Sequence, residues 1–366
     1  MRPKLLILVL SLVVVVGLAV LIPCLAPAGE VSSTYHYKVL TPIQHGNLAV
    51  FPVAVGVSHD TQGFLTLDEG LRSGEVVVSE SGSVTPLVRP RHGVIPPPQR
   101  GGGAQVNQLV LVNNSKRPLI LLAGEIVTGG KQDRVIGKDR LVPAESDPID
   151  LGVFCVEPGR WIGPKMSFDP MGSPMAAPGV RAKAMVDKDQ QKVWSEVRSS
   201  QARVAAQMPS PAAAEVVKGT TSYAKVMQND GVKEKVDSVA VPIQHDYQSL
   251  IKQLRDRNAV GVVVAVNGEI IWADIFASTS LLEKYWPKLV RSYAAEAIVS
   301  RVRNQEPDIK AAQQFLDDME GRREMVETEP GLYRHTEITG DSFKAFELTS
   351  LLPKTGFDLH LAKMAE

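Results

Sequence analysis

The dipeptide Asn267-Gly268 lies between two apolar segments and constrains the fold more than any other feature of the sequence. The segments are Val260–Val266 and Glu269–Phe276, each long enough to form one strand. Asn and Gly readily adopt the positive backbone angles of a tight two-residue turn, which reverses the chain between antiparallel strands. The pattern therefore predicts a β-hairpin in the second half of the chain.

The first half of the chain, after Tyr35, is rich in short apolar runs that are bounded by turn residues and are typical of strands. These runs are Leu48–Val55, Val76–Val78, Gln108–Val112 and Leu119–Leu122. The second half carries helical patterns beside the predicted hairpin. We therefore expect an α+β fold with a β-rich N-terminal half and a helical and β-hairpin C-terminal half.

Several stretches of the second half place apolar residues at helical spacing. A narrow apolar stripe from Val186 to Met208 predicts a helix of about 20 residues. Another helix is expected to begin near Pro287, because a proline in the first turn removes no hydrogen bond. Further helices are expected over residues 212–228, 246–257 and 308–321, and strands over residues 333–338, 345–348 and 358–361.

The N-terminus is typical of a leader and not of a folded domain. Arg2 and Lys4 precede the apolar run Leu5–Ile22, whose length falls between the ~7–15 residues of a signal-peptide core and the ~20 of a spanning helix. Both interpretations stay open, and the small residues that follow allow cleavage. We expect residues 1–28 to be a signal peptide or a membrane anchor. The basic end stays in the cytoplasm, which places the body outside it.

Charge and cysteine content narrow the function classes. Lys and Arg number 40, and Asp and Glu also number 40, so removal of the leader with its two basic residues leaves a net charge of −2. Such a body lacks the strongly basic face of nucleic-acid-binding proteins. Only Cys155 of the two cysteines lies beyond the leader, which excludes a disulfide scaffold.

The densest polar segment runs from Ala123 to Arg134 and directly follows a predicted strand. Its paired glycines can present backbone N–H groups to an anion, with Lys131 and Arg134 adding charge and Gln132 a directional donor. A nucleotide-binding P-loop is excluded, because Glu125 occupies the place of its first glycine and Gln132 that of its Ser or Thr. The alternative is a glycine-rich hairpin whose charges are solvated.

A second polar segment is Phe154–Trp161. Side chains alternate along a strand, so Cys155 and Glu157 share a face. In a binding site, Glu157 could act as an acid or base, Arg160 as an anion ligand and Trp161 as a stacking wall. The ordinary alternative is an internal Glu–Arg pair beside a packed Trp. A lone buried cysteine such as Cys155 is more often a small core residue than a nucleophile.

Metal and cofactor chemistry have little support. The histidines are dispersed, and the sequence contains neither an HExxH nor a CxxC spacing. It also lacks the GxSxG elbow of serine hydrolases. We therefore expect no metal and no cofactor, and the sequence does not decide whether the domain is an enzyme.

An ordered series of motifs resembles one known family, the ARG and rhodanese-phosphatase-superfamily-associated protein domain, over about Tyr35 to Arg303. The motifs are Leu40–Leu48 with Phe51-Pro52, Gly124-Glu125, Gly129–Arg134, Cys155–Trp161 and a later block of Gly268, Asp274–Phe276, Trp286, Lys288-Leu289 and Ser292–Ala294. In the family, Lys-Gln usually continues with Asn-Arg, whereas this chain has Asp133 in place of the Asn.

The resemblance implies an association with ADP-ribosylglycohydrolase proteins, and through it a link to ADP-ribose or related nucleotides. Because it ends near Arg303, we expect this domain over residues 35–303, with a helical insert near residues 185–230. Residues 304–366 are then expected as a C-terminal helix plus a β extension.

The leading hypothesis is an exported or membrane-tethered domain whose two polar segments form one cleft for an anionic ligand that carries phosphate or ribose. The membrane is its expected partner, through the N-terminal segment, and nucleic acid is not. In this hypothesis Glu125 or Glu157 acts as an acid or base, and the ligand is held by Lys131, Gln132, Arg134, Arg160 and Trp161. The alternative is a non-catalytic module of the cell envelope in which the same residues are structural.

Overall fold

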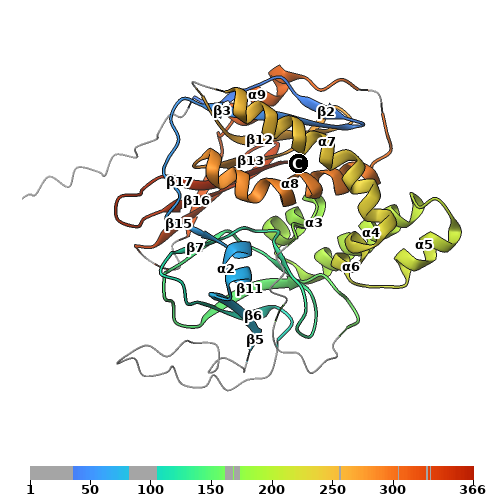
Figure 1. Ribbon diagram of the computed structural model, residues 1–366, viewed down its shortest axis with the longest axis horizontal. Coiled ribbons are helices and arrows are strands. Elements are labelled where there is room, and N and C mark those ends of the chain that lie inside the picture. The colour runs from blue at the N-terminus through green and yellow to red at the C-terminus, as the bar shows by residue number, and fades with distance from the viewer. Residues whose placement is uncertain are drawn as a thin grey trace, which may run out of the picture. The chain divides into compact units, whose positions relative to one another are not determined.

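The predicted hairpin is confirmed and forms part of the largest sheet of the computed structural model (Figure 1). Its strands are β12 (Asn258–Val266) and β13 (Glu269–Phe276). The turn residues Asn267 and Gly268 have φ angles of 55° and 79°, in the left-handed region that Asn and Gly tolerate best. The local turn chemistry therefore accounts for this part of the fold.

The largest sheet is antiparallel throughout and takes strands from both ends of the chain. Its order is β1-β3-β12-β13-β17-β16-β15-β14, and β2 pairs with β3. The additional strands are β1 (Lys38–Val39), β2 (Ile43–His45), β3 (Leu48–Val55), β14 (Arg322–Val326), β15 (Tyr333–Thr339), β16 (Phe343–Ser350) and β17 (Asp358–Ala365). Residues 304–366, which we expected as an extension, thus contribute four strands to the same sheet as the hairpin.

The first half is β-rich, as predicted, and builds two smaller sheets. One has the order β5-β6-β11-β9-β8 and the other the order β10-β7-β4. The strands are β4 (Leu65–Thr66), β5 (Val76–Glu80), β6 (Gln108–Asn113), β7 (Leu119–Leu121), β8 (Ile126–Val127), β9 (Arg134–Ile136), β10 (Arg140–Val142) and β11 (Ile149–Cys155). Together with α2 (Leu67–Ser73), these sheets enclose an apolar core of their own, as residues such as Leu71, Leu111 and Leu121 show.

Helix α8 (Thr279–Val299) packs on β3, β12 and β13, and α7 (Asp230–Gln253) packs on α8 (Figure 1). The prediction that this helix begins near Pro287 was wrong. It begins at Thr279, because the hydroxyl of Ser278 caps it by accepting the N–H of Leu281 at 3.0 Å. Pro287 lies inside the helix, where burial of its apolar face outweighs the lost hydrogen bond.

The remaining helices lie mainly between β11 and α7 along the chain. They are α3 (Pro178–Ala182), the π-helix η2 (Lys183–Asp187), α4 (Gln190–Ala206), α5 (Pro211–Lys218), α6 (Tyr223–Gln228) and α9 (Ile309–Asp317). The long helix expected up to Met208 is divided into η2 and α4, because Lys188 adopts a left-handed conformation and Asp189 then caps α4. The helix expected over residues 212–228 is likewise interrupted after Gly219, and the one expected over residues 246–257 is the end of α7.

The structure describes residues 36–81, 105–160, 168, 174–254, 257–303, 305–326, 329 and 331–366. Residues 37–366 form one unit by their contacts. The predicted leader, residues 1–28, lies outside the described residues, and so does Trp161. Within the described ranges, no helix combines the length and the apolar composition that a membrane crossing requires.

Candidate functional site

The two glycines before Lys131 form a tight turn, and other side chains pack directly against it. Gly129 and Gly130 have φ angles of 112° and 52°. A Cβ added at Gly130 would lie 2.6 Å from Phe168 Cζ and 2.7 Å from Glu80 Oε1. The same Glu80 oxygen accepts the main-chain N–H of Lys131 at 2.7 Å. Close packing against Phe168 and Glu80 therefore requires a glycine at position 130, and the positive φ angle of Gly129 favours a glycine there as well.

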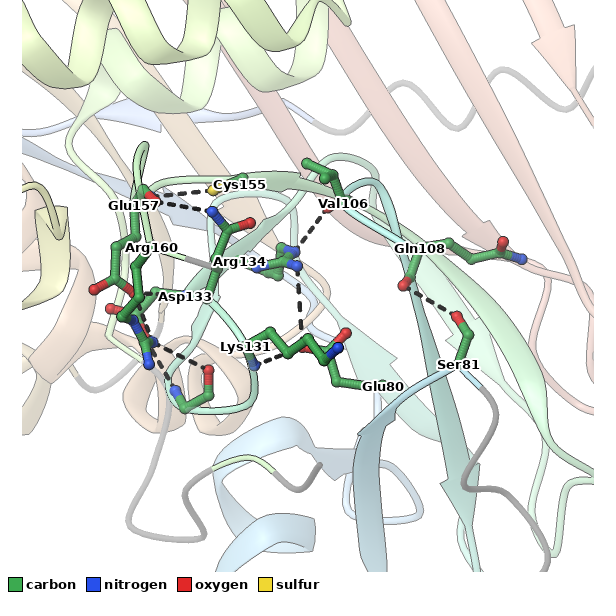
Figure 2. Close-up of polar contacts among 12 residues, drawn as sticks. Glu80, Ser81, Val106, Gln108, Lys131, Asp133, Arg134, Cys155, Glu157 and Arg160 are labelled. Atoms are coloured by element: carbon green, nitrogen blue, oxygen red, sulfur yellow. Dashed lines mark hydrogen bonds and ion pairs between the residues drawn. The ribbon is translucent and has the colours of Figure 1, made fainter. Parts of the chain in front are cut away.

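Arg134 begins β9, and protein surrounds its guanidinium (Figure 2). Its Nε donates to the carbonyl oxygen of Val106 at 2.7 Å, and its Nη2 lies 4.0 Å from Glu80 Oε1. The side chains of Arg134 and Glu80 are both fully buried. Burial lowers the pKa of Arg134, although nearby acidic groups oppose that effect. A ligand would reach this guanidinium only after the surrounding strands move.

The two polar segments contact each other in a group that we call the outer cluster: Asp133, Glu157 and Arg160 (Figure 2). Arg160 Nη2 lies 2.6 Å from Glu157 Oε2 and 3.6 Å from Asp133 Oδ1. The side chain of Arg160 is 29% exposed, whereas those of Glu157 and Asp133 are 3% and 5% exposed. Gln132 joins the cluster by donating from Nε2 to the Glu157 carbonyl at 3.1 Å. These charged groups therefore pair with one another.

The outer cluster also holds the beginning of α6. Ser222, the N-cap of this helix, donates its hydroxyl proton to Asp133 Oδ2 at 2.6 Å and accepts the N–H of Lys225. Lys225 Nζ lies 3.9 Å from Glu157 Oε1. The N–H of Tyr223 donates to the carbonyl of Val156 at 3.0 Å. The second polar segment and α6 are thus fastened to each other by main-chain and side-chain contacts.

Cys155 is a buried end residue of β11. Its main-chain N–H and carbonyl both bond to the side-chain amide of Gln190, at 2.8 and 2.9 Å, which fastens α4 to the strand. Burial raises the pKa of the thiol, so the reactive thiolate is disfavoured. These contacts agree with the interpretation of Cys155 as a core residue.

Glu125 lies apart from the outer cluster in its contacts and faces α8. Its Oε1 lies 2.5 Å from Lys288 Nζ, which is also 2.9 Å from Asp68 Oδ2. Burial raises the pKa of Glu125, although Lys288 opposes that shift. Burial works against the charge of Lys288, but the two carboxylates outweigh it and raise its pKa. The ammonium is therefore held in one place in its charged form.

A cavity of about 440 Å³ lies where α6, α7 and α8 meet residues 174 and 175. Much of its wall is apolar, formed by side chains such as Met175, Met227 and Val236. Three cationic side chains also line it: Lys233, Lys288 and Arg291. Two carboxylates on α7, Asp230 and Asp237, also line the wall. The first polar segment is linked to this cavity through Glu125, which pairs with Lys288, and through Asp133, which holds the start of α6.

A second ionic group, which we call the core network, was missed by the sequence analysis: Asp139, Arg181, Asp274 and His360. Arg181 binds Asp274 through two hydrogen bonds of 2.8 and 2.9 Å, and the hydroxyl of Tyr293 also donates to Asp274. His360 bridges Asp139 at 2.5 Å and Asp274 at 3.1 Å.

The core network is buried, and the charges enclosed with His360 explain the raised pKa of this residue. Burial works against protonation of His360, but Asp139 and Asp274 outweigh it and raise its pKa to about 9. Gly124 of the first motif packs on the network, since a Cβ there would lie 2.5 Å from Arg181 Cγ. One signal could have found these residues: Asp274 and His360 each stand between apolar neighbours inside a strand, where a buried charged group needs a partner.

Among the described residues, no group of three or more His, Cys, Asp or Glu side chains is arranged to hold a metal ion. The family model of the ARG and Rhodanese-Phosphatase-superfamily-associated Protein domain matches residues 36–362. No curated protein and no solved structure matches the chain.

Proposed function

Since the chain belongs to the ARG and Rhodanese-Phosphatase-superfamily-associated Protein domain family, we propose that it binds a small anionic ligand with an apolar portion in the cavity between α6, α7 and α8. The observation that carries the proposal is a cavity of about 440 Å³ with three cationic side chains on a largely apolar wall. Small-molecule sites typically enclose ~300–1,000 Å³ and combine apolar walls with a few fixed polar groups.

The charges of the wall favour an anion. The lining itself carries three cations, Lys233, Lys288 and Arg291, and two carboxylates, those of Asp230 and Asp237. The carboxylates of Glu125 and Asp68, which pair with Lys288, lie outside this lining. Arg291 Nε is held by Asp237 at 2.9 Å. Lys288 is fixed from behind by carboxylates and has a side chain only 10% exposed. A cation that is already oriented loses little freedom when a ligand arrives.

In this proposal the sequence motifs build the walls of the site. Glu125 positions Lys288, and it is therefore a positioning residue and not a free acid or base. Asp133 and Glu157 hold α6 through Ser222 and Lys225. The direct ligand contacts that we expected from Lys131, Gln132, Arg134 and Arg160 are replaced by support of the surrounding elements.

A binding experiment tests the proposal on the full-length chain. The probes are nucleotides, ADP-ribose, sugar phosphates and octanoate, whose carboxylate ends an apolar chain. A probe at 100 times its Kd should stabilise the fold by about 2.7 kcal/mol in thermal or chemical unfolding. Lys288→Met should weaken binding about tenfold or more, because it removes one charge-assisted contact. Lys284→Met is the matched control, since Lys284 lies on the same helix but pairs with Glu69.

Lys288→Met removes the lysine partner of the buried Glu125 carboxylate, which destabilises the fold. A second variant therefore tests the cavity without breaking this ion pair. Met227→Trp fills the cavity with a larger side chain and should abolish binding while the fold persists. Val216→Trp, at an exposed residue of α5, is its control. The proposal fails if no probe stabilises the wild type, or if Lys288→Met and Met227→Trp bind as the wild type does.

The pairing within the outer cluster favours a second candidate function, a non-catalytic module of the cell envelope. In that case the motif residues are structural, and no small molecule stabilises the protein. Fragment screening by NMR separates the two functions, because an interaction module would show no saturable small-molecule site at the α6–α8 cavity.

For localisation we propose a membrane-tethered or exported body behind the N-terminal segment, on the basis of its apolar run and basic end. Mass spectrometry of the mature N-terminus, with cell fractionation, distinguishes an anchor from a cleaved signal. An intact N-terminus in the soluble cytoplasmic fraction would contradict both.

A further inference from the structure

One face of β15 presents an unusual buried histidine. Tyr333, His335 and Glu337 alternate along the strand and so share a face. His335 is 1% exposed, and within the described part of the chain neither of its ring nitrogens has a hydrogen-bond partner. Its Nδ1 lies 4.0 Å from Glu337 Oε1, beyond hydrogen-bond distance. Leaving such nitrogens unsatisfied costs ~1–3 kcal/mol, so a ligand or water that pairs with them is favoured.

Two lysines stand over the same face, on either side of His335. Lys138 Nζ lies 5.7 Å from the ring centroid of Tyr333, and Lys188 Nζ lies 2.5 Å from Glu337 Oε1. Lys138 comes from the β9–β10 turn and Lys188 from the end of η2, so three separate segments meet here.

The ammonium of Lys138 is the cationic group on this face that a new acceptor would stabilise most. Among the residues that the structure describes, it forms no ion pair or hydrogen bond through its ammonium, and it is half-buried. Burial lowers its pKa, and the charges of Arg140 and Lys188 lower it further, although Glu329 and Glu337 oppose this shift. Arg140 is already paired with Glu329, so it does not compete for a new anion. A partly desolvated ammonium is stabilised by an anion at this place.

We propose that Lys138, Lys188 and His335 form a second binding site, for an oxyanion such as a phosphate or a carboxylate. The two ammonium groups outnumber the nearby Glu337 carboxylate by one charge. The imidazole of His335 supplies an N–H donor to the anion. The site is separate from the α6–α8 cavity and shares none of its lining residues, so the failure of either proposal leaves the other standing.

The test is isothermal titration of the full-length chain with inorganic phosphate and with acetate, against chloride at equal ionic strength. We expect phosphate or acetate to bind more tightly than chloride. The oxyanion that binds more tightly identifies the chemical class of the ligand. Lys138→Gln and Lys188→Gln should each weaken binding about tenfold, as expected for the loss of one charge-assisted contact. The control is Lys218→Gln on α5, an exposed lysine paired with Glu215, which should bind like the wild type.

His335→Phe keeps an aromatic ring but removes both nitrogens, and it should weaken binding as well. Lys188 is exposed and Lys138 is only half-buried, so their variants keep the test decisive even if His335→Phe destabilises the fold. The proposal is overturned if neither oxyanion binds better than chloride. It is also overturned if Lys138→Gln and Lys188→Gln bind as tightly as the wild type.

Discussion

The core network and the outer cluster are both built from carboxylates paired with an arginine, but they differ in their access to water. In the core network, Arg181 and Asp274 have fully buried side chains. In the outer cluster, the side chain of Arg160 is 29% exposed. Water reaches the guanidinium of Arg160 and can fill the space that its loss would leave beside the carboxylates, whereas the first pair has no contact with water. The burial of an ion pair therefore determines how much unfolding free energy is lost when one partner is removed.

Arg181→Met tests the buried side of this comparison and should have the largest effect. It leaves the buried carboxylates of Asp139 and Asp274 to share the single positive charge of His360, and one uncompensated buried charge costs ~3–5 kcal/mol of unfolding free energy. Urea unfolding at neutral pH measures the loss. Arg198→Met, at an exposed position of α4, is the control and should change stability by less than ~0.5 kcal/mol. A loss below ~1 kcal/mol for Arg181→Met would show that the core network is dispensable.

The pH dependence of stability tests the charge state of the core network. The pKa of His360 is raised from its ordinary value to about 9 in the folded protein, so folding favours the protonated form. The stabilisation is complete below pH ~6.5 and is lost as the pH rises through about 9, by ~3 kcal/mol in total. Urea unfolding between pH 6 and pH 10 should show this loss. His360→Gln should flatten the curve, and an unchanged slope in that variant would contradict the assignment.

Ser222→Ala tests the contact between the outer cluster and α6. The variant removes the N-cap of the helix and the hydrogen bond to Asp133 Oδ2, which together should cost ~1–2 kcal/mol. Ser210→Ala removes an exposed N-cap on α5 and serves as the matched control. Thermal and urea unfolding measure both. Equal losses in the two variants would mean that the contact with Asp133 adds no stability.

Arg160→Met should have the smallest effect of the four, ~1 kcal/mol or less, because its side chain is partly exposed to water. After the change, Glu157 keeps its contact with Lys225 and gains access to solvent. Urea unfolding beside Arg181→Met gives the direct comparison. A loss as large as that of Arg181→Met would erase the distinction between the two groups.

Local features of the fold were predictable from the sequence. The hairpin at Asn267-Gly268 and the tail strands near residues 333–338 and 345–348 appear as expected. Their signals are turn preference and the apolar pattern of neighbouring residues. Errors arose at helix boundaries: Ser278 starts α8 well before Pro287, and Lys188 interrupts a continuous apolar stripe. At such points a cap or a single backbone conformation competes with the apolar pattern.

The candidate site was only partly predictable. The sequence identified the two polar segments, and they meet in the outer cluster. It did not reveal that Glu125 pairs with Lys288, 163 residues further along the chain. Nor did it indicate the cavity, whose walls come from three helices and a short segment.

The domain family, the β-rich first half and the hairpin could be inferred from the sequence alone, because these depend on ordered motifs and on neighbouring residues. Which charges are buried, and which partners they find, became evident from the folded chain. Asp139 and His360 are 221 residues apart and touch only after β17 enters the sheet beside β13. Ion pairing depends on distance in space and on access to water, and neither is encoded in the local pattern of a single sequence.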